Sequence, residues 1–582
     1  MRLPARPQRP ASIYHAAGGR QSTASFVSTA SAAVIAARTG DGGGGGDDKK
    51  AAAKDCTVTE GSELGISAVD SRYSSLNRQL LLCAMLAAVS SINYGWVIGS
   101  VNIPAQVIEQ CSGGPETWTA GFPSCIPMGS TLWGLVVGLT PLGAWAGSMF
   151  SGLAADRFGR KRALMANNAF YVAGALLACT ATSIAQLAVG RFVSGVGCGV
   201  AATVVSTYNS EVATVRSRGF LGGFQQLMIL AGVFLSQVVS IGLSNAPLWR
   251  ILFSISAAIA IVQTLLLLLF VPESPRYLAS TCQLDETRAA LQRLRPGLDI
   301  TLELEALVAS LESAARDSDA PQPTMWQVLT GRTEVDLRHL AFSALFLMVS
   351  QQWSGAKGVM FYSTEVLTVT FHLTSEEKKH IPTIAQLITL AVAGVGVLAV
   401  ILGMNILDRV GRRTVLVVSS LLTTLSAALI VVGSHLDIGA LVATAMCLFN
   451  FVFQAGAGFI PYLCASELLP YSVLGSISGL ATSLNCLVLF IVSFTFPILD
   501  KALGAYLFTP FIATNLLTFL FAFFLMPEAK GKSIADVVDE YKGPLRFIGT
   551  PFSRRESAAT IATAPSLDAL PSPAKVGGTP QQ

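Results

Sequence analysis

The stretch Asp156-Arg157-Phe158-Gly159-Arg160-Lys161-Arg162 lies between two long apolar runs, and it recurs later in the chain as Asp408-Arg409-Val410-Gly411-Arg412-Arg413. Each copy is a short basic loop that joins two hydrophobic segments. A loop duplicated in this way indicates a membrane protein with two related halves. Because short loops rich in Arg and Lys stay on the cytoplasmic side of a bilayer, we predict that both copies are cytoplasmic.

The composition agrees with a membrane protein. The chain has 582 residues, of which 52% are hydrophobic and only 13% are charged, and its mean hydropathy is +0.57. This leaves too little polar surface for a soluble protein of that length. The net charge is only +4. Since the basic residues cluster beside apolar runs, we expect the lipid bilayer to be a partner and nucleic acid not to be one.

Apolar runs long enough to cross a bilayer follow one another along the chain. A hydrocarbon core of about 30 Å needs roughly 20 apolar residues per helix, and about twelve such runs can be drawn. They lie near residues 79–100, 131–153, 163–181, 186–208, 220–243, 251–271, 339–364, 381–406, 414–433, 438–464, 472–496 and 505–526. The sequence therefore predicts an all-α membrane protein with twelve transmembrane helices in two six-helix halves, 76–271 and 339–526.

The remaining segments are polar. Residues 1–75, rich in Ala, Gly, Ser and Arg, cannot bury an apolar face, so we predict a disordered cytoplasmic tail there and another at 527–582. The first of these also resembles an organelle transit peptide, which stays open as an alternative. Residues 272–338 show amphipathic spacing and are expected to form short cytoplasmic helices between the halves.

Chemistry-bearing motifs are scarce. There is no Walker loop and no metal-like spacing among the five histidines, so the sequence predicts neither an enzyme nor a cofactor nor a metal site. Most of the ten cysteines lie in apolar runs, where Cys behaves as a small hydrophobe. Cys111 and Cys125 instead flank a polar loop predicted to be outside, and they form either a disulfide or two free thiols.

Further motifs carry a resemblance to a known family. Apart from the two basic loops they are Gly190-Arg191, Glu211 with Arg218-Gly219, Pro272-Glu273-Ser274-Pro275-Arg276-Tyr277-Leu278, Pro527-Glu528-Ala529-Lys530-Gly531-Lys532, and Thr131-Leu132-Trp133 with Asn102-Ile103-Pro104. This set resembles the sugar-porter branch of the major facilitator superfamily, and more narrowly the GLUT-type facilitative hexose transporters. The resemblance implies alternating-access transport of a hexose such as glucose by a protein that functions as a monomer. It also implies a plasma-membrane location, with an organelle membrane as the alternative.

Charged residues at the helix ends of both halves are candidates for a cytoplasmic gate, in which ion pairs form when the inside closes and break when it opens. The alternative is that these charges only fix topology. The candidates are Asp156, Arg157, Arg160, Glu211 and Arg218 in the first half and Asp408, Arg409, Arg412, Arg413 and Glu467 in the second. The family usually has an Arg where this chain has Leu474. We therefore expect the second half of the gate to be weaker.

A sugar-binding site needs amides, hydroxyls and aromatic faces, and polar groups inside membrane spans tend to mark the transport pathway. The resemblance implies that the sugar is hydrogen-bonded by Gln226, Gln351, Gln352 and Asn485. On helix ten, Gln454 can supply a further hydrogen bond and Tyr462 an aromatic face. The alternative is that such amides only join helices, which we prefer for Gln225. On helix eight the family has an Asn where this chain has Gly396.

Lys357 is the sharpest departure from the family, which usually has Asn at this position. A Lys inside an apolar span needs water, an acidic partner or an anionic ligand. One hypothesis is that Lys357 donates to substrate oxygens and favours a carboxylate or phosphate. The other is that it reaches the outer face from a helix broken at Gly355 and Gly358.

Energy coupling depends on helix one. Proton-coupled members of the family carry an Asp at the position of Val97, whereas this chain has no acidic residue between Gln79 and Ile108. We therefore predict downhill uniport. The alternatives are a proton site elsewhere, a carrier of organic anions or polyols that uses Lys357, and a nutrient sensor with a transporter fold.

Overall fold

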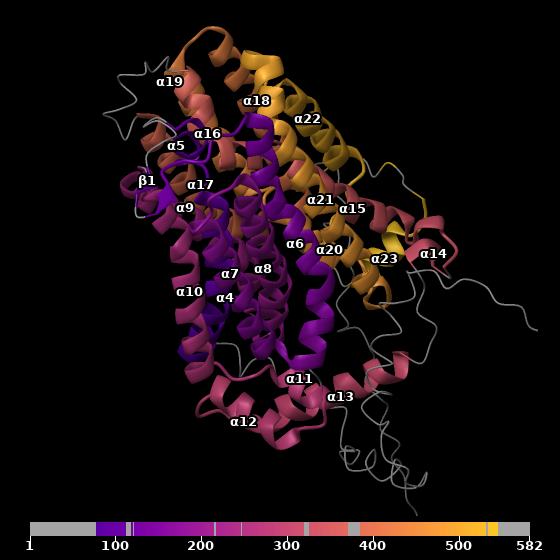
Figure 1. Cartoon of the computed structure of the whole chain (residues 1–582). Coiled ribbons are helices and arrows are strands. Elements are labelled where there is room, and N and C mark those ends of the chain that lie inside the picture. The colour runs from indigo at the N-terminus through magenta and orange to yellow at the C-terminus, as the bar shows by residue number, and fades with distance from the viewer. Residues whose placement is uncertain are drawn as a thin grey trace, which may run out of the picture. The chain divides into compact units, whose positions relative to one another are not determined.

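The computed structural model describes residues 77–111, 118–119, 121–214, 217–245, 247–318, 325–333, 335–370, 384–530, 534–544 and 547. The predicted N-terminal tail, 1–75, and residues 548–582 of the C-terminal one lie outside this range. The first half contains α4 (Arg78–Gly99), α6 (Ser130–Phe158), α7 (Arg160–Cys179), α8 (Ile184–Val212), α9 (Arg218–Leu243) and α10 (Trp249–Phe270) (Figure 1). The second contains α15 (Arg338–Trp353), α16 (Ala356–Thr370), α17 (Ile384–Val410), α18 (Arg412–His435), α19 (Gly439–Ala455), α20 (Ile460–Glu467), α21 (Tyr471–Leu503) and α22 (Thr509–Phe524).

These helices form the twelve spans that the sequence predicts. In the described part of the chain, nine helical segments are long and apolar enough to cross a membrane by length and composition. One of the nine runs through α19 and α20 together. The other spans fall short for simple reasons: α7 begins with three basic residues, α22 has 16 residues, and α15 and α16 are two pieces of one broken span.

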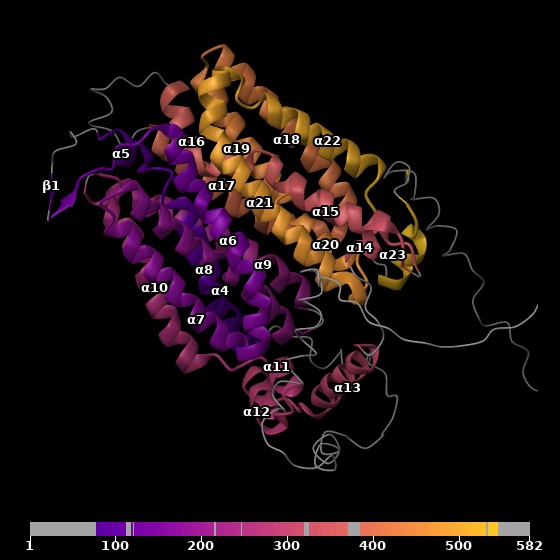
Figure 2. The same ribbon diagram turned by 45° about the vertical axis from the view of Figure 1, so that its right-hand side comes forward.

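The two halves lie side by side, and each is held together mainly by helices of its own (Figure 2). Within the first half, α6 packs closely on α8, because a Cβ atom at Gly195 would overlap the Thr140 carbonyl oxygen. Between the halves, α6 packs on α21 and α9 on α17. Trp145 Nε1 donates to Ser483 Oγ at 2.6 Å across the first of these contacts.

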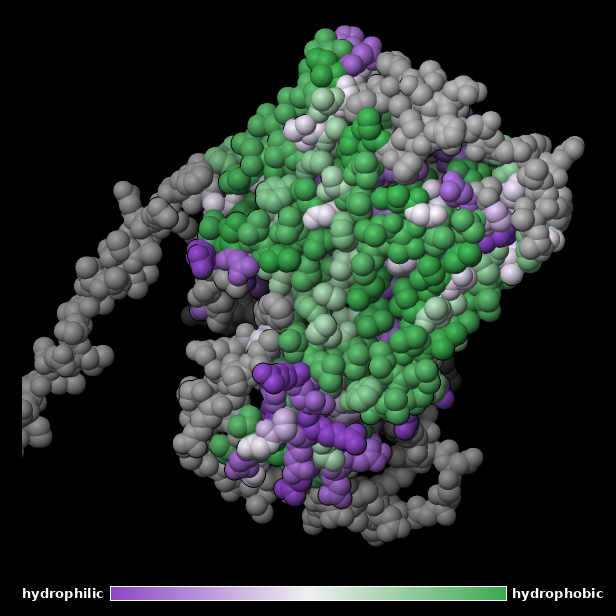
Figure 3. Space-filling model, turned by 90° about the vertical axis from the view of Figure 1, so that its left-hand side faces the viewer, coloured by the Kyte–Doolittle hydropathy of each residue, from purple (hydrophilic) through white to green (hydrophobic). Residues whose placement is uncertain are grey.

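The outer surface of the helices is apolar, as lipid contact requires. Leu265, Leu268 and Leu269 on α10 are 56%, 51% and 72% exposed. Figure 3 shows a broad hydrophobic face over the spans, with hydrophilic residues gathered at one end. Exposing these apolar side chains to water would cost free energy, and in a bilayer lipid tails would cover them.

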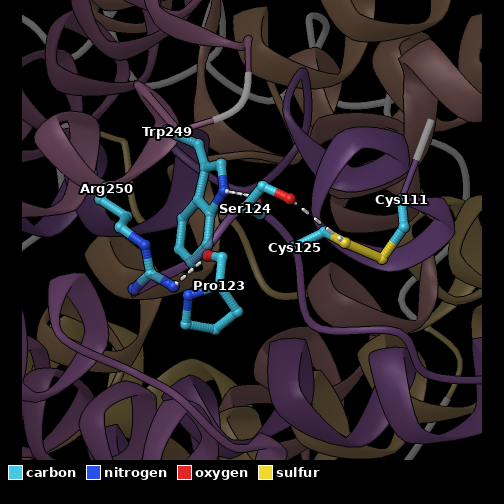
Figure 4. The surroundings of a disulfide bond; sticks show 6 residues. All are labelled: Cys111, Pro123, Ser124, Cys125, Trp249 and Arg250. Carbon is cyan, nitrogen blue, oxygen red and sulfur yellow. Dashed lines mark hydrogen bonds between the residues drawn. A yellow bond between two sulfur atoms is a disulfide. The ribbon is translucent and has the colours of Figure 1, made fainter. Parts of the chain in front are cut away.

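The segment between α4 and α6 is tied together at one end of the spans, which we call the disulfide end. Cys111, at the end of α5 (Ala105–Gln110), and Cys125 form a disulfide, which settles the alternative that the sequence leaves open (Figure 4). Trp249 Nε1 donates to the Ser124 carbonyl oxygen at 2.8 Å, and Arg250 donates to the preceding carbonyl oxygen at 2.7 Å. The loop is therefore anchored to the start of α10.

Between the halves lie α11 (Pro275–Ser280), α12 (Leu284–Leu294), α13 (Thr301–Ser318) and α14 (Met325–Thr330). The Ser274 hydroxyl accepts from the Tyr277 N–H at 3.3 Å and so caps the start of α11. On α12 one side of the helix is buried, with Ala290, Leu291 and Leu294 among the buried residues. This is the amphipathic pattern of a surface helix.

Two details differ from the sequence-based expectation. The all-α prediction did not include the pair of two-residue strands β1 (Trp118–Thr119) and β2 (Phe122–Pro123), which form an antiparallel ladder. Within the predicted C-terminal tail, α23 (Ile534–Tyr541) is helical, and its Val537 and Tyr541 are each only 1% exposed. The helix has an apolar face that packs on the core, which the polar composition of the tail as a whole conceals.

Candidate substrate-binding site and charged loops

The candidate site lies where two spans of the second half are broken. Helix α15 ends at Trp353 and α16 begins at Ala356, while α19 ends at Ala455 and α20 begins at Ile460. Breaks of this kind free backbone polar groups in the middle of a span, where they can bind a ligand or a polar side chain. The Ser354 carbonyl oxygen at the first break accepts from Asn515 Nδ2 of α22 at 2.9 Å.

Asn485 on α21 is the centre of a buried amide cluster. Its Nδ2 donates to the Met348 carbonyl oxygen at 2.7 Å and to Gln351 Oε1 at 2.8 Å. Its Oδ1 accepts from Gln352 Nε2 at 2.9 Å and from the Tyr462 hydroxyl at 3.2 Å. Four predicted site residues, from α15, α20 and α21, are thus joined in one hydrogen-bonded group.

The cluster also reaches the second helix break and leaves one acceptor free. Gln351 Nε2 donates to the Gly458 carbonyl oxygen at 2.6 Å. Gln352 is 4% exposed, and in the described part of the chain its Oε1 atom has no hydrogen-bond partner. A buried amide oxygen without a partner is uncommon and calls for an explanation. Tyr462 is 46% exposed although its hydroxyl contacts Asn485, so protein atoms do not enclose the whole of its side chain.

A second amide contact joins the two halves. Gln226 Nε2 on α9 approaches Gln454 Oε1 on α19 at 3.4 Å, and Gln454 Nε2 approaches Asn450 Oδ1 at 3.5 Å. Asn450 in turn donates to the Val392 carbonyl oxygen at 2.7 Å. A Cβ atom at Gly396 would lie 2.6 Å from Asn450 Nδ2, so an amide from α19 occupies the space where the family has an Asn on helix eight.

By contrast, Gln225 donates to the Ala202 carbonyl oxygen of α8 at 2.8 Å, which is a helix-packing contact. Lys357 on α16 is partly buried, and among the described residues its ammonium has the Met360 sulfur as its contact, at 3.7 Å. A thioether is a weak acceptor, so this contact does not balance the charge. Glu365 forms no ion pair with Lys357 in the described part of the chain.

At the opposite end of the spans, the first basic loop forms a charged cluster with α8. Arg160 pairs with Glu211 at 2.8 Å and with Asp156 at 3.1 Å. The other Glu211 oxygen accepts from the Ser274 hydroxyl at 2.5 Å. Arg157 is exposed and lies over the Phe158 ring, 5.6 Å from its centroid.

The second basic loop forms a matching cluster. Arg412 donates to both oxygens of Glu467, each at 3.0 Å. Arg413 is 3% exposed and donates to two carbonyl oxygens of α22, at 3.1 and 2.6 Å. Arg409 is exposed, and its carbonyl oxygen accepts from Lys530 Nζ at 2.5 Å. The described part of the chain does not include the side chains of Arg218, Asp408 and Leu474. That the second half of the gate is weaker than the first therefore stays a prediction.

Each loop is also fastened to the segment that follows the last helix of its own half. Glu273 accepts from the first two backbone N–H groups of α7, at 2.8 and 2.9 Å, and Glu528 from those of α18, at 3.2 and 3.1 Å. A carboxylate at a helix N-terminus is favoured by the helix dipole. Gly159 and Gly411, with φ of 94° and 108°, let the chain approach these carboxylates.

Glu273→Ala and Glu528→Ala are each expected to lower the free energy of unfolding by about 1–3 kcal/mol, because each removes charge-assisted hydrogen bonds to a helix N-terminus. Thermal unfolding of the purified protein in detergent measures this loss. Glu305→Ala, an exposed glutamate on α13, is the control. Melting temperatures of the two variants equal to that of the control would contradict a stabilising role for these carboxylates.

Sequence reasoning missed several of these groups. Glu273 and Glu528 belong to motifs that the sequence marks, but their contacts with the basic loops were not foreseen. Asn450 was not singled out, although a polar residue inside an apolar span is the signal that identified Gln226. Asn102 was also missed as a contact: its Nδ2 donates to the Met360 carbonyl oxygen at 2.9 Å and joins the halves at the disulfide end.

Two pseudo-equivalent helical halves with a polar cluster at broken helices define a membrane transporter of the major facilitator type. Comparison with known proteins agrees, since residues 83–541 match the family model described as "Sugar (and other) transporter". The chain therefore belongs to this sugar transporter family. It is a multi-pass integral membrane protein, and it is a sugar transporter and not an enzyme.

Individual relatives are distant. A probable metabolite transport protein of Saccharomyces cerevisiae is 29% identical over 472 residues, covering 78% of this chain and 93% of its own length. Facilitated glucose transporter member 4 of solute carrier family 2 from Homo sapiens is 31% identical over 480 residues, covering 79% and 90%. A partially occluded, inward-open structure of the xylose transporter XylE from E. coli aligns with a TM-score of 0.64 at 20% identity, covering 78% of this chain and 100% of that one.

Proposed function

We propose that the protein is a facilitative transporter, a uniporter, of a hexose such as glucose, acting by alternating access. The observation that carries this proposal is the amide cluster of Gln351, Gln352, Asn485 and Tyr462 at the two helix breaks. The cluster carries no formal charge, and it combines amide donors, amide acceptors and an aromatic ring. These are the groups that a neutral, hydroxyl-covered ring requires.

The free Oε1 atom of Gln352 supports the same proposal. A sugar hydroxyl that donates to this oxygen would satisfy a buried acceptor that no described residue satisfies. Gln226 and Gln454 come from different halves and meet at 3.4 Å, so a sugar bound between them would contact both halves. Such a position is suited to alternating access, because movement of one half against the other exposes the ligand to either side.

The absence of an acidic side chain from the first span supports uniport. Helix α4 carries no acidic residue. Val97 occupies the position at which coupled members of the family have Asp, and its carbonyl oxygen accepts from Arg191 at 2.7 Å. The relatives include both mechanisms: the human relative is a facilitated glucose transporter, whereas XylE is described as a proton:xylose symporter.

Counterflow of labelled hexose in proteoliposomes tests this proposal. Vesicles loaded with unlabelled sugar should accumulate the label transiently, and collapsing the pH gradient should leave initial uptake unchanged. Loss of uptake with the pH gradient would overturn uniport. Absence of counterflow with every neutral hexose and every sugar acid would favour a nutrient sensor. We further propose that the protein works as a monomer in the plasma membrane, which size analysis in detergent and fluorescence localisation check.

A second candidate substrate class follows from Lys357, whose ammonium has only the thioether contact among the described residues. A carboxylate or phosphate on the substrate would supply the missing partner, so a sugar acid is the alternative cargo. The role of Lys357 in substrate binding remains a proposal, as do those of Gln226 and Gln454.

Lys357→Asn is expected to lower the apparent affinity for a sugar acid about 10- to 100-fold while leaving that for a neutral hexose nearly unchanged, because it removes one charge-assisted hydrogen bond. Competition of sugar acids, polyols and hexoses against labelled uptake measures the ranking. Lys357→Arg, which keeps the charge, is the control. An unchanged ranking in the Asn variant would remove the anion hypothesis.

A further inference from the structure

A small cavity in the first half lies beside a buried arginine that is not part of the proposed sugar-binding site. The cavity has a volume of about 10 Å³, and helices α4, α7, α8 and α10 surround it. Its lining includes Arg191 and Ser194 of α8, Trp96 of α4 and Ser256 of α10. Arg191 is only 2% exposed.

The guanidinium of Arg191 is largely without partners. Its Nη1 donates to the Val97 carbonyl oxygen at 2.7 Å, but Nε and Nη2 are buried and have no hydrogen-bond partner among the described residues. None of the ion pairs between described residues includes Arg191. A guanidinium has five N–H donors and stays protonated, so this group is a buried positive charge with at least two unused donor atoms.

The other polar groups in the wall are of two kinds. Trp96 Nε1 donates to the Leu252 carbonyl oxygen at 3.0 Å, and the Ser256 hydroxyl donates to Asn93 Oδ1 at 2.7 Å. The Ser100 hydroxyl donates to the Val97 carbonyl oxygen at 3.3 Å, so these three donors are already used. The Ser194 hydroxyl forms no hydrogen bond with another described residue. An occupant of the cavity would therefore meet unused donors from Arg191 and Ser194.

We propose that this cavity binds one small monovalent anion, of the size and charge of chloride. Burying an unpaired charge in an apolar region is costly, and a counter-ion inside the cavity removes most of that cost. The volume is of the order that one small particle needs, and sulfate and gluconate are both bulkier than chloride. The anion would hold α8 to α4 through Arg191. This proposal does not depend on which sugar is carried.

The first test uses the purified full-length protein in detergent at constant ionic strength. Exchange of sodium gluconate for sodium chloride is expected to raise the melting temperature by about 2–5 °C in a saturable way, because an ion that binds only the folded state stabilises it. Bromide should act as chloride does, and sulfate should act as gluconate does. Equal melting temperatures in all four salts would overturn the proposal.

Variants of the cavity wall test whether the chloride-dependent rise in melting temperature comes from this cavity. Arg191→Gln should abolish the chloride-dependent shift in melting temperature. Ser194→Val, which removes the hydroxyl and fills space, should lower the apparent affinity for chloride at least about tenfold. Ser206→Ala is the matched control, because Ser206 is an exposed serine of the same helix that bonds only to the backbone of its own helix. A full chloride shift in Ser194→Val would contradict binding at this site, even if Arg191→Gln does not fold.

Discussion

Asn485→Leu is expected to lower the apparent affinity for the transported sugar about 10- to 100-fold. Asn485 makes four side-chain hydrogen bonds, and its loss leaves Gln351, Gln352 and the Tyr462 hydroxyl without their common partner. Each buried polar group left unpaired costs about 1–3 kcal/mol, part of which the side chains recover by rearranging. The rearranged amides would no longer present the same donors and acceptors to a sugar ring.

Concentration-dependent counterflow and the sugar-induced shift in melting temperature both measure this loss. Gln225→Leu is the control, because Gln225 is also an intramembrane amide but contacts the Ala202 carbonyl oxygen between α8 and α9. We expect Gln225→Leu to affect stability more than apparent affinity. The site assignment would fail if Asn485→Leu kept the wild-type affinity, or if the two variants reduced affinity equally.

The spans and the loops were predictable because each depends on local sequence. A run of about 20 apolar residues predicts a span regardless of its neighbours, and the duplicated loop was visible as a repeat. The Asn485 cluster was predictable only as a set of residue types. Its pairing depends on the breaks at Gly355 and Gly456, which bring α15, α20 and α21 together.

Contacts between distant segments could not be predicted in this way. Glu273 and Glu528 cap helices that begin more than a hundred residues earlier, and nothing in the spacing indicates which N–H groups they accept from. Asn450 occupies the space left by Gly396 because two helices cross there, and helix crossing is a tertiary property. In lipid-exposed helices the apolar residues surround the whole circumference, so periodicity gives little information on which face points inward.

Val97→Asp is expected to make sugar uptake depend on the proton gradient. The Val97 side chain is 4% exposed and lines the cavity of Arg191, whose guanidinium already contacts the Val97 carbonyl oxygen. A carboxylate at this position would supply the acidic partner that Arg191 lacks among the described residues. Its protonation would release Arg191 and its deprotonation would restore the pair, so the two protonation states would favour different arrangements of α4 and α8.

Initial uptake into vesicles with an outside-acid gradient, compared with uptake after a protonophore, measures this coupling. We expect at least about fivefold stimulation by the gradient in Val97→Asp and none in the wild type or in Val97→Asn, which has the same shape without a titratable group. The same variants also bear on the anion site. A carboxylate beside Arg191 would compete with chloride for the same guanidinium, so the chloride-dependent melting shift should vanish in Val97→Asp and persist in Val97→Asn. Equal responses of the two variants would show that Arg191 senses no charge at this position, which would contradict both the coupling prediction and the anion site.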